Sequence, residues 1–119
     1  RWGEALGAAE RAVALNPESS AAHLIRGYAL GNQGYVEQSL DAFRSAHRID
    51  PKDVLVLCLI SDCHRKLGDF NSARRTLLRA LQIAPTDPLA GRMMKQLARA
   101  EQRHHEKDRT VTAGVTVEQ

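Results

Sequence analysis

The chain has 119 residues, of which 43% are hydrophobic and 26% charged, and its formal net charge is +3. This length predicts at most one ordinary domain, and the composition excludes a disordered charged tail and a collagen-like fibre. The longest apolar run, 54–60, is too short for a transmembrane helix. Only 4% of the residues are aromatic, so Ala, Leu, Ile and Val must fill the core, which favours close helix packing over a β-sandwich.

The cysteines and the charge pattern indicate the compartment and the kind of partner to expect. Cys58 and Cys63 are too few for a disulfide scaffold, so we expect a reducing compartment, the cytoplasm. No basic-then-apolar leader opens the chain, and no signal peptide is expected. Basic residues are interleaved with acids, and their densest stretch, 92–109, lacks exposed aromatic residues and a known motif, so we expect no nucleic-acid partner.

A 34-residue repeat organises the sequence. Pro17, Pro51 and Pro85 follow one another at this step. The same step relates four further series, which are Ala12, Ala46 and Ala80; Leu15, Ile49 and Ile83; Ser19, Asp53 and Asp87; and Gly34 with Gly68. A shared period of this length predicts an array of helical repeats rather than a domain with a single central core.

The repeat predicts six helices in chain order. Residues 1–19 form a partial repeat with one helix, and residues 20–53 and 54–87 are complete repeats of two helices each. Ser19, Asp53 and Asp87 are suited to N-cap the first helix of the next unit. Each first helix ends at a left-handed glycine, and each second helix stops before a proline. A capping helix over 88–107 completes a domain of residues 1–107, and 108–119 is expected to be a disordered tail.

The chain resembles the tetratricopeptide repeat (TPR) family over about residues 2–105. The positions that match its signature are Trp2, Ala5, Ala12, Pro17, Gly27, Gly34, Phe43, Ala46, Pro51, Gly68, Phe70, Ala73, Leu77, Ala80 and Pro85. The second helices and the turns match well, whereas the first helices depart from the signature. The departing positions are His23, Arg26, Leu30, Leu57, Ile60, Ser61 and His64.

The resemblance implies an all-α, right-handed superhelix whose concave wall is formed by the first helix of each unit. Its inward positions are Leu24, Tyr28, Asn32, Cys58, Leu59, Asp62, Arg65, Lys66, Arg92, Met93, Gln96 and Arg99. They predict a partly apolar groove with a basic edge, suited to an amphipathic helix or to an extended, acidic peptide. The Lys and Asn residues with which some family members hold a C-terminal carboxylate are replaced here. Alternatively, these residues cover neighbouring repeats of a longer array.

No catalytic, metal or cofactor site is expected. His104 and His105 point about 100° apart on a helix, and with Glu101 they do not form a closed metal site. His23 and His64 are interpreted as half-buried packing residues, and His47 as solvated. The cysteines lack CxxC spacing and a paired base, and phosphate-loop, GxSxG and HExxH motifs are absent from the sequence.

Three functions follow as hypotheses. The first is a non-catalytic scaffold that binds a protein partner in the groove, with apolar contacts flanked by basic residues. The second is the repeat region of a larger enzyme, such as a transferase. The third is a homodimer formed through the first helix, which lacks a preceding partner helix in the repeat.

Overall fold

The computed structural model describes residues 1–118, with side chains for residues 1–109. The helices are α1 (Trp2–Leu15), α2 (Ser20–Asn32), α3 (Val36–Ile49), α4 (Val54–Lys66), α5 (Phe70–Ile83) and α6 (Pro88–Glu118). No strand occurs in this part of the chain. The prediction of an all-α helical repeat with about six helices is therefore confirmed.

The turns between helices have the predicted chemistry. The side chain of Ser19 accepts a hydrogen bond from the backbone of Ala22 at the start of α2, and Asp53 and Asp87 cap α4 and α6 in the same way. Gly34 and Gly68 adopt φ values of +89° and +81°, which residues with a side chain rarely tolerate. Asp69, which the sequence analysis did not identify, caps α5 by accepting from the backbone N–H of Ser72 at 3.1 Å.

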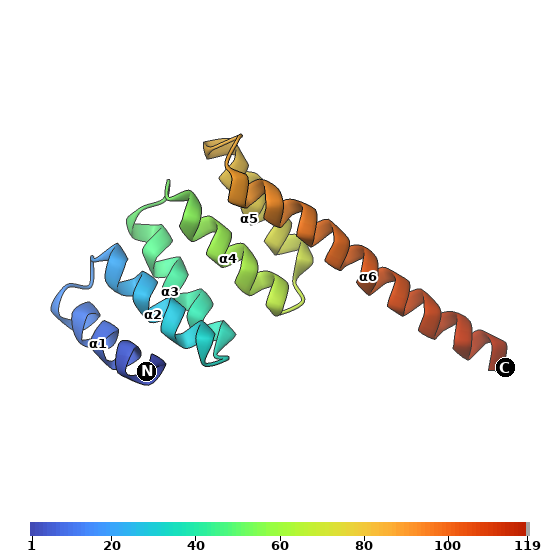
Figure 1. Cartoon of the computed structure of the whole chain (residues 1–119), viewed down its shortest axis with the longest axis horizontal. Helices are drawn as coiled ribbons and strands as arrows, with labels where there is room; N and C mark the ends of the chain where they lie inside the picture. Colours follow the sequence, from blue (N-terminus) through green and yellow to red (C-terminus); the bar gives the residue numbers. More distant parts are fainter. Residues whose placement is uncertain (119) are drawn as a thin grey trace.

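The helices stack in sequence to form an elongated molecule of 62 × 33 × 20 Å (Figure 1). Each helix packs on the next along the chain, and α4 also contacts α6. In Figure 1, α2, α4 and α6 lie toward the viewer, with α3 and α5 behind them. The radius of gyration is 17.3 Å, against about 13.5 Å for a compact domain of this length. The chain therefore has an extended shape that offers two broad faces.

The last helix is longer than predicted. From the sequence this helix is expected to end near residue 107, with a disordered tail over 108–119, but α6 continues to Glu118 and projects beyond the stack (Figure 1). No proline follows Pro88, and side chains four residues apart contact one another through the predicted end, as in the pairs Gln102–Glu106 and His104–Asp108. The tail prediction is thus wrong for 108–118, and residue 119 lies outside the described residues.

The middle of α6 is held against α5. Arg74 of α5 forms an ion pair with Glu101, and the Phe70 and His104 rings lie 5.6 Å apart. No helix in the described chain is long and apolar enough to cross a membrane.

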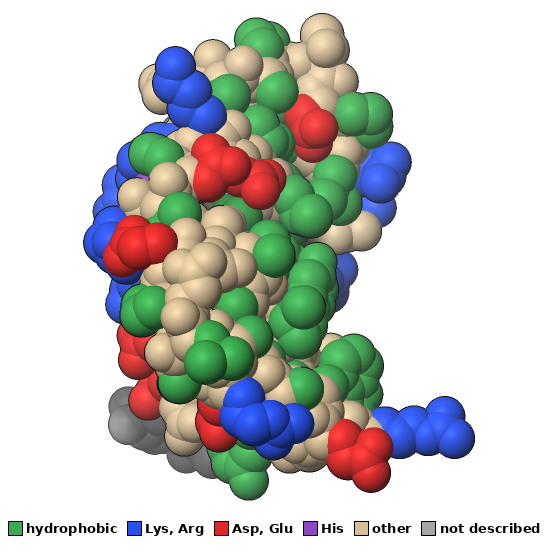
Figure 2. Space-filling view, turned by 90° about the vertical axis from the view of Figure 1, so that its left-hand side faces the viewer, with side chains coloured by type: hydrophobic (Ala, Val, Ile, Leu, Met, Phe, Trp, Pro, Cys, Tyr) green, Lys and Arg blue, Asp and Glu red, His purple; other side chains and the backbone are tan. Residues whose placement is uncertain are grey.

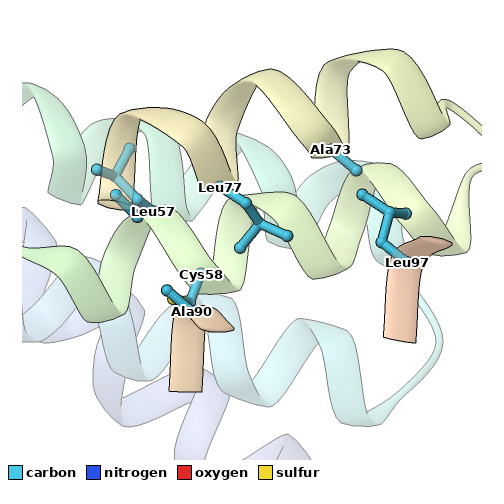
Figure 3. Close-up of a cluster of buried hydrophobic side chains, with 7 residues drawn as sticks. Leu57, Cys58, Ala73, Leu77, Ala90 and Leu97 are labelled. Carbon is cyan, nitrogen blue, oxygen red and sulfur yellow. The ribbon is translucent and has the colours of Figure 1, made fainter. Parts of the chain in front are cut away.

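Two apolar clusters form the core. One joins α4, α5 and α6 (Figure 3) and consists of Leu57, Cys58, Ala73, Leu77, Ala80, Ala90 and Leu97. The other joins α3 and α4 and consists of Leu40, Phe43, Ala46, Val56, Ile60 and Cys63. α4 contributes to both clusters, so its two faces are buried against different neighbours. Alanine is frequent at the crossings because it lets helix axes approach closely.

α1 is packed on one side only. It contacts α2, and within it only Ala9 is buried. Ala12 is exposed, although Ala46 and Ala80 at the same position of the later repeats are fully buried. Trp2 and Leu15 are also exposed, at 46% and 88%, and Figure 2 shows hydrophobic side chains on this end of the molecule. In the part of the chain that the structure describes, α3 and α5 each pack between a preceding and a following helix, whereas no described helix precedes α1.

Candidate functional site

A hollow on the α2 and α4 side of the molecule has a volume of about 220 Å³. It lies between these two helices, with α3 as its floor. Its walls include five of the predicted groove residues, which are Tyr28, Asn32, Leu59, Asp62 and Lys66. The sequence therefore identified both walls, which belong to the first helices of the two complete repeats.

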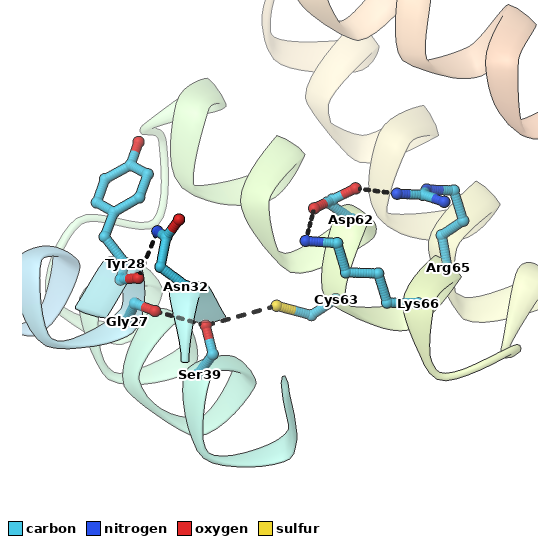
Figure 4. Close-up of polar contacts among 8 residues, drawn as sticks. All are labelled: Gly27, Tyr28, Asn32, Ser39, Asp62, Cys63, Arg65 and Lys66. Carbon is cyan, nitrogen blue, oxygen red and sulfur yellow. Dashed lines mark hydrogen bonds and ion pairs between the residues drawn. The ribbon is translucent and has the colours of Figure 1, made fainter. Parts of the chain in front are cut away.

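Tyr28 and Asn32 form the α2 wall. The Tyr28 ring is 38% exposed and meets the Phe43 ring edge to face, with 5.7 Å between centroids. Asn32 donates from its amide to the Tyr28 carbonyl oxygen at 2.8 Å (Figure 4). This contact holds the Asn32 side chain along its own helix. The Phe43 ring thus supports the Tyr28 ring, and the exposed part of the Tyr28 ring is available to contact a ligand.

The floor of the hollow is a close contact between α2 and α3. The Ser39 hydroxyl donates to the Gly27 carbonyl oxygen at 2.7 Å, and the Cys63 sulfur of α4 lies 3.9 Å from the same hydroxyl (Figure 4). The next repeat has the reciprocal bond, because Ser61 of α4 donates to Ala73 of α5 at 2.8 Å. In both complete units a serine hydroxyl thus links the two helices. The serine belongs to the second helix in one unit (Ser39) and to the first helix in the other (Ser61).

Asp62 is the charged centre of the α4 wall. Its carboxylate accepts from Arg65 at 2.8 Å and pairs with Lys66 at 3.0 Å, and both partners lie on the same helix (Figure 4). Burial alone would raise the pKa of Asp62, but the hydrogen bonds from Arg65 and Lys66 outweigh it and lower the pKa. Asp62 is therefore ionised at neutral pH and compensates part of the basic edge that the sequence predicts.

A second, smaller hollow continues the groove between α4 and α6. It has a volume of about 20 Å³, and Asp62, Arg65, Met93 and Gln96 contribute to its walls. Because Asp62 lines both hollows, the surface runs from α2 across α4 to α6 without a break in its lining residues.

The remaining predicted groove residues are placed differently. Cys58 is fully buried in the core, so its assignment to the groove surface is wrong. Burial, and then the nearby Asp87 carboxylate, raise the pKa of its thiol to about 11, which keeps it protonated. Leu24 packs against the α3–α4 cluster and is only partly exposed, whereas Arg92 and Arg99 of α6 are exposed.

Two of the histidine interpretations need correction. His23 is almost fully buried, with Nε2 2.9 Å from the Pro17 carbonyl oxygen. His47, expected to be solvated, is half-buried, and its Nδ1 is inaccessible. Burial and then Arg79 lower the pKa of His47. His64 is half-buried, as predicted.

The contribution of α3 to the groove is not among the sequence predictions. Val36, Ser39 and Phe43 line the hollow together with Gly27 and Gly31 of α2. The two glycines are four residues apart and so share one helix face. Two glycines at this four-residue spacing indicate, from the sequence alone, that a neighbouring helix approaches α2 closely at this face.

The Asp62 pairs predict a pH effect. The folded-state pKa of Asp62 lies below its usual value of 3.8, so its stabilising contribution is present above that pH and is lost as the pH falls through the folded value. We expect the melting temperature of Asp62→Asn to fall less than that of the natural chain between pH 7 and about pH 2. Asp41→Asn is the control, because that carboxylate is exposed and 3.7 Å from Arg44. Equal pH dependence in the natural chain and the Asp62 variant would contradict this role.

The fold of this chain is similar to the folds of several solved proteins. By structure, the chain is similar to the TPR domain of OM64 from Arabidopsis (TM-score 0.75, 22% identity, covering 81% of this chain and 79% of that one). It is also similar to PcrH in complex with the chaperone-binding region of PopD (TM-score 0.76, 22% identity, 87% and 80% covered). A third similar structure is the second TPR domain of human RPAP3 in complex with an HSP70 peptide (TM-score 0.76, 15% identity, 82% and 81% covered).

Sequence comparison identifies the family directly. No curated protein matches the chain. Two tetratricopeptide repeat family profiles do match, one over residues 32–97 and the other over residues 1–54. The first of these spans more than half of the chain, and together they cover residues 1–97. This protein therefore belongs to the tetratricopeptide repeat family.

Proposed function

We propose that this chain is a protein-interaction module that binds a peptide or a helix of a partner protein in the groove along α2, α4 and α6. The observation that carries the proposal is the 220 Å³ hollow, which combines the supported Tyr28 ring with polar groups on both walls. PcrH and the RPAP3 domain, which share this fold, were each solved in complex with a segment of another protein.

The groove offers both apolar and charged contacts to such a segment. Tyr28, Leu59 and Met93 supply exposed or half-exposed apolar surface, with Leu24 at its edge. Among the described residues, Arg92 and Arg99 take part in no ion pair, whereas Arg65 and Lys66 share Asp62. We therefore assign the selection of acidic partner residues mainly to the α6 arginines. Burial of the apolar contacts supplies affinity, and the charges orient the segment.

Two other hypotheses from the sequence stay predictions. TPR domains are generally non-catalytic interaction modules, and no observation here favours the repeat region of a larger enzyme. Homodimer formation through α1 has the exposed Trp2 and Leu15 side chains in its favour.

Site-specific crosslinking tests the groove. A photo-reactive phenylalanine analogue at position 28 is expected to crosslink a partner segment from a lysate of the source organism. The same analogue at position 35 is the matched control, because Tyr35 is 52% exposed and lies at the turn between α2 and α3, outside the 220 Å³ hollow. Equal crosslinking of the same segment from both positions would contradict binding in the groove.

A charge reversal then tests the basic residues with the segment so identified. Arg65→Glu combined with Arg92→Glu is expected to weaken binding at least tenfold while the helical circular-dichroism signal stays constant. Arg103→Glu with Lys107→Glu changes the charge equally on the exposed part of α6 and is expected to alter binding less than twofold. Full-strength binding by the first variant shows that the basic residues of the groove do not select the partner.

A further inference from the structure

A second cleft lies on the opposite side of the repeat from the groove. It is formed by α3, the end of α4 and α5, and its volume of about 490 Å³ is more than twice that of the groove hollow. The residues that line it are Arg44, His64, Ser72, Arg75, Thr76 and Arg79. None of them lines the groove hollow, so the two surfaces are separate.

The cleft is strongly basic. Arg75 and Arg79 are four residues apart on α5 and share one face, and Arg44 projects from α3. Figure 2 shows Lys and Arg side chains gathered along its left-hand edge, which is the side facing away from the viewer in Figure 1. A partner that fills this cleft therefore meets guanidinium groups from two helices.

The protein's own acids neutralise little of this charge. Among the described residues, Arg44 alone of the three arginines forms an ion pair, with Asp41 at 3.7 Å, and both side chains are more than half exposed. Such exposed pairs contribute little and exchange readily with other anions. Asp69, at the end of the cleft near His64, is occupied in capping α5. Arg75 donates to the Ser72 hydroxyl at 3.0 Å, which positions its guanidinium without neutralising it.

Two histidines, His47 and His64, lie close to the arginines of the cleft. Burial, and then Arg44, lower the pKa of His64, and burial followed by Arg79 lowers the pKa of His47. Asp69 acts in the opposite sense on His64 but does not reverse the shift. Both rings are therefore neutral at pH 7, and the cleft holds arginine charge without protonated histidine.

From these contacts we infer that the cleft between α3 and α5 is a second binding surface, which takes an acidic segment of a protein partner through Arg44, Arg75 and Arg79. Guanidinium groups pair with carboxylates through two parallel hydrogen bonds, so arginines on facing helices suit closely spaced Asp or Glu side chains. The cleft is too large for a single small anion and has room for several residues of an extended chain. A segment in the groove and an acidic segment in the cleft would bind to opposite sides of the two complete repeats.

Binding of a defined peptide tests this inference. The probe is a fluorescein-labelled peptide with four consecutive glutamates in a Gly–Ser background, and the control peptide has glutamines in their place. The natural chain is expected to bind the glutamate peptide at least tenfold more tightly than the glutamine peptide. A phosphoserine peptide of the same length is the third arm, and preferred binding of that peptide would overturn the assignment to a carboxylate-bearing segment.

Paired variants locate the binding. Arg75→Glu with Arg79→Glu is expected to weaken glutamate-peptide binding at least tenfold, and Arg75→Gln with Arg79→Gln repeats the test with a smaller perturbation of the fold. Arg103→Glu with Lys107→Glu makes the same charge change on exposed residues of α6, outside both the groove and the cleft, and is expected to alter this binding less than twofold. Equal losses from both charge reversals, or a loss from the α6 pair alone, overturn the inference. The groove proposal is judged separately, by the position 28 crosslink.

Histidine signals give a readout that does not depend on the variants. Binding of the glutamate peptide is expected to shift the NMR ring signals of His47 and His64 and to raise the pKa of His64, because the carboxylates offset the charge of Arg44. His104 and His105 on α6 are expected to remain unchanged. Shifts confined to the α6 histidines would place the peptide elsewhere and overturn the inference.

Discussion

Ala80→Leu and Ala46→Leu are each expected to lower the free energy of unfolding by about 1–3 kcal/mol. Both alanines are 0% exposed, and each lies where the second helix of a repeat packs closely against its neighbours. A leucine adds three carbon atoms to a contact that has no room for them. The helices must then separate or the side chain must leave its preferred rotamer. Urea unfolding followed by circular dichroism measures the loss.

The repeat supplies a matched control for this prediction. Ala12 occupies the same position of the preceding unit but is exposed, because no described helix covers that face of α1. Ala12→Leu is therefore expected to change stability by less than about 0.5 kcal/mol. Equal destabilisation at all three positions would mean that α1 is covered by a second copy of the chain in solution. Unchanged stability at positions 46 and 80 would contradict the close packing itself.

Gly27→Ala is expected to destabilise the chain by about 1–3 kcal/mol through one specific clash. A Cβ atom added at Gly27 would lie 2.6 Å from Cδ1 and 2.8 Å from Cζ of the Phe43 ring. The ring is itself only 3% exposed, so it has little freedom to move aside. Thermal or urea unfolding measures the effect. Gly91→Ala is the control, since an added Cβ there meets no atom within 4 Å, and alanine should be neutral or stabilising in that helix.

A double mutant tests the cause of the Gly27 effect. Phe43→Leu alone is expected to cost about 1 kcal/mol, because it removes buried ring atoms. Combined with Gly27→Ala it should cost clearly less than the sum of the two single changes, with a coupling of about 1 kcal/mol or more. In the next repeat the equivalent positions already hold such a pair: Ser61, which is larger than Gly27, and Leu77, which is smaller than Phe43. Strictly additive effects would show that the glycine is required for another reason.

The position of a residue within the repeat predicts which side of its helix the side chain lies on, but not whether another helix covers that side chain. The family resemblance placed Tyr28, Asp62 and Met93 on the inward side of the first helices, and these residues do line the two hollows. The same reasoning placed Cys58 there, but α6 covers it. Helical phase fixes the direction in which a side chain points relative to its own helix. It does not fix which neighbouring helix meets that side chain.

Charge is the second property that the sequence left open. Arg65 and Lys66 predict a basic edge, yet Asp62 lies within reach of both, so their net effect is reduced. Conversely, Arg44 is distant in sequence from Arg75 and Arg79, and only the packing of α3 beside α5 gathers them around one cleft. Electrostatic potential depends on distances through space, which a linear charge count does not contain.

The sequence by itself determined the repeat, the helices and the chemistry of the turns. These features are local: a cap, a left-handed glycine or a proline acts within one helical turn of its own position, as at Asp53, Gly68 and Pro51. The tertiary structure alone decided which side chains are buried and which charges share a surface. Those outcomes depend on contacts between residues far apart in the chain, such as Arg74 with Glu101, and no local pattern encodes them.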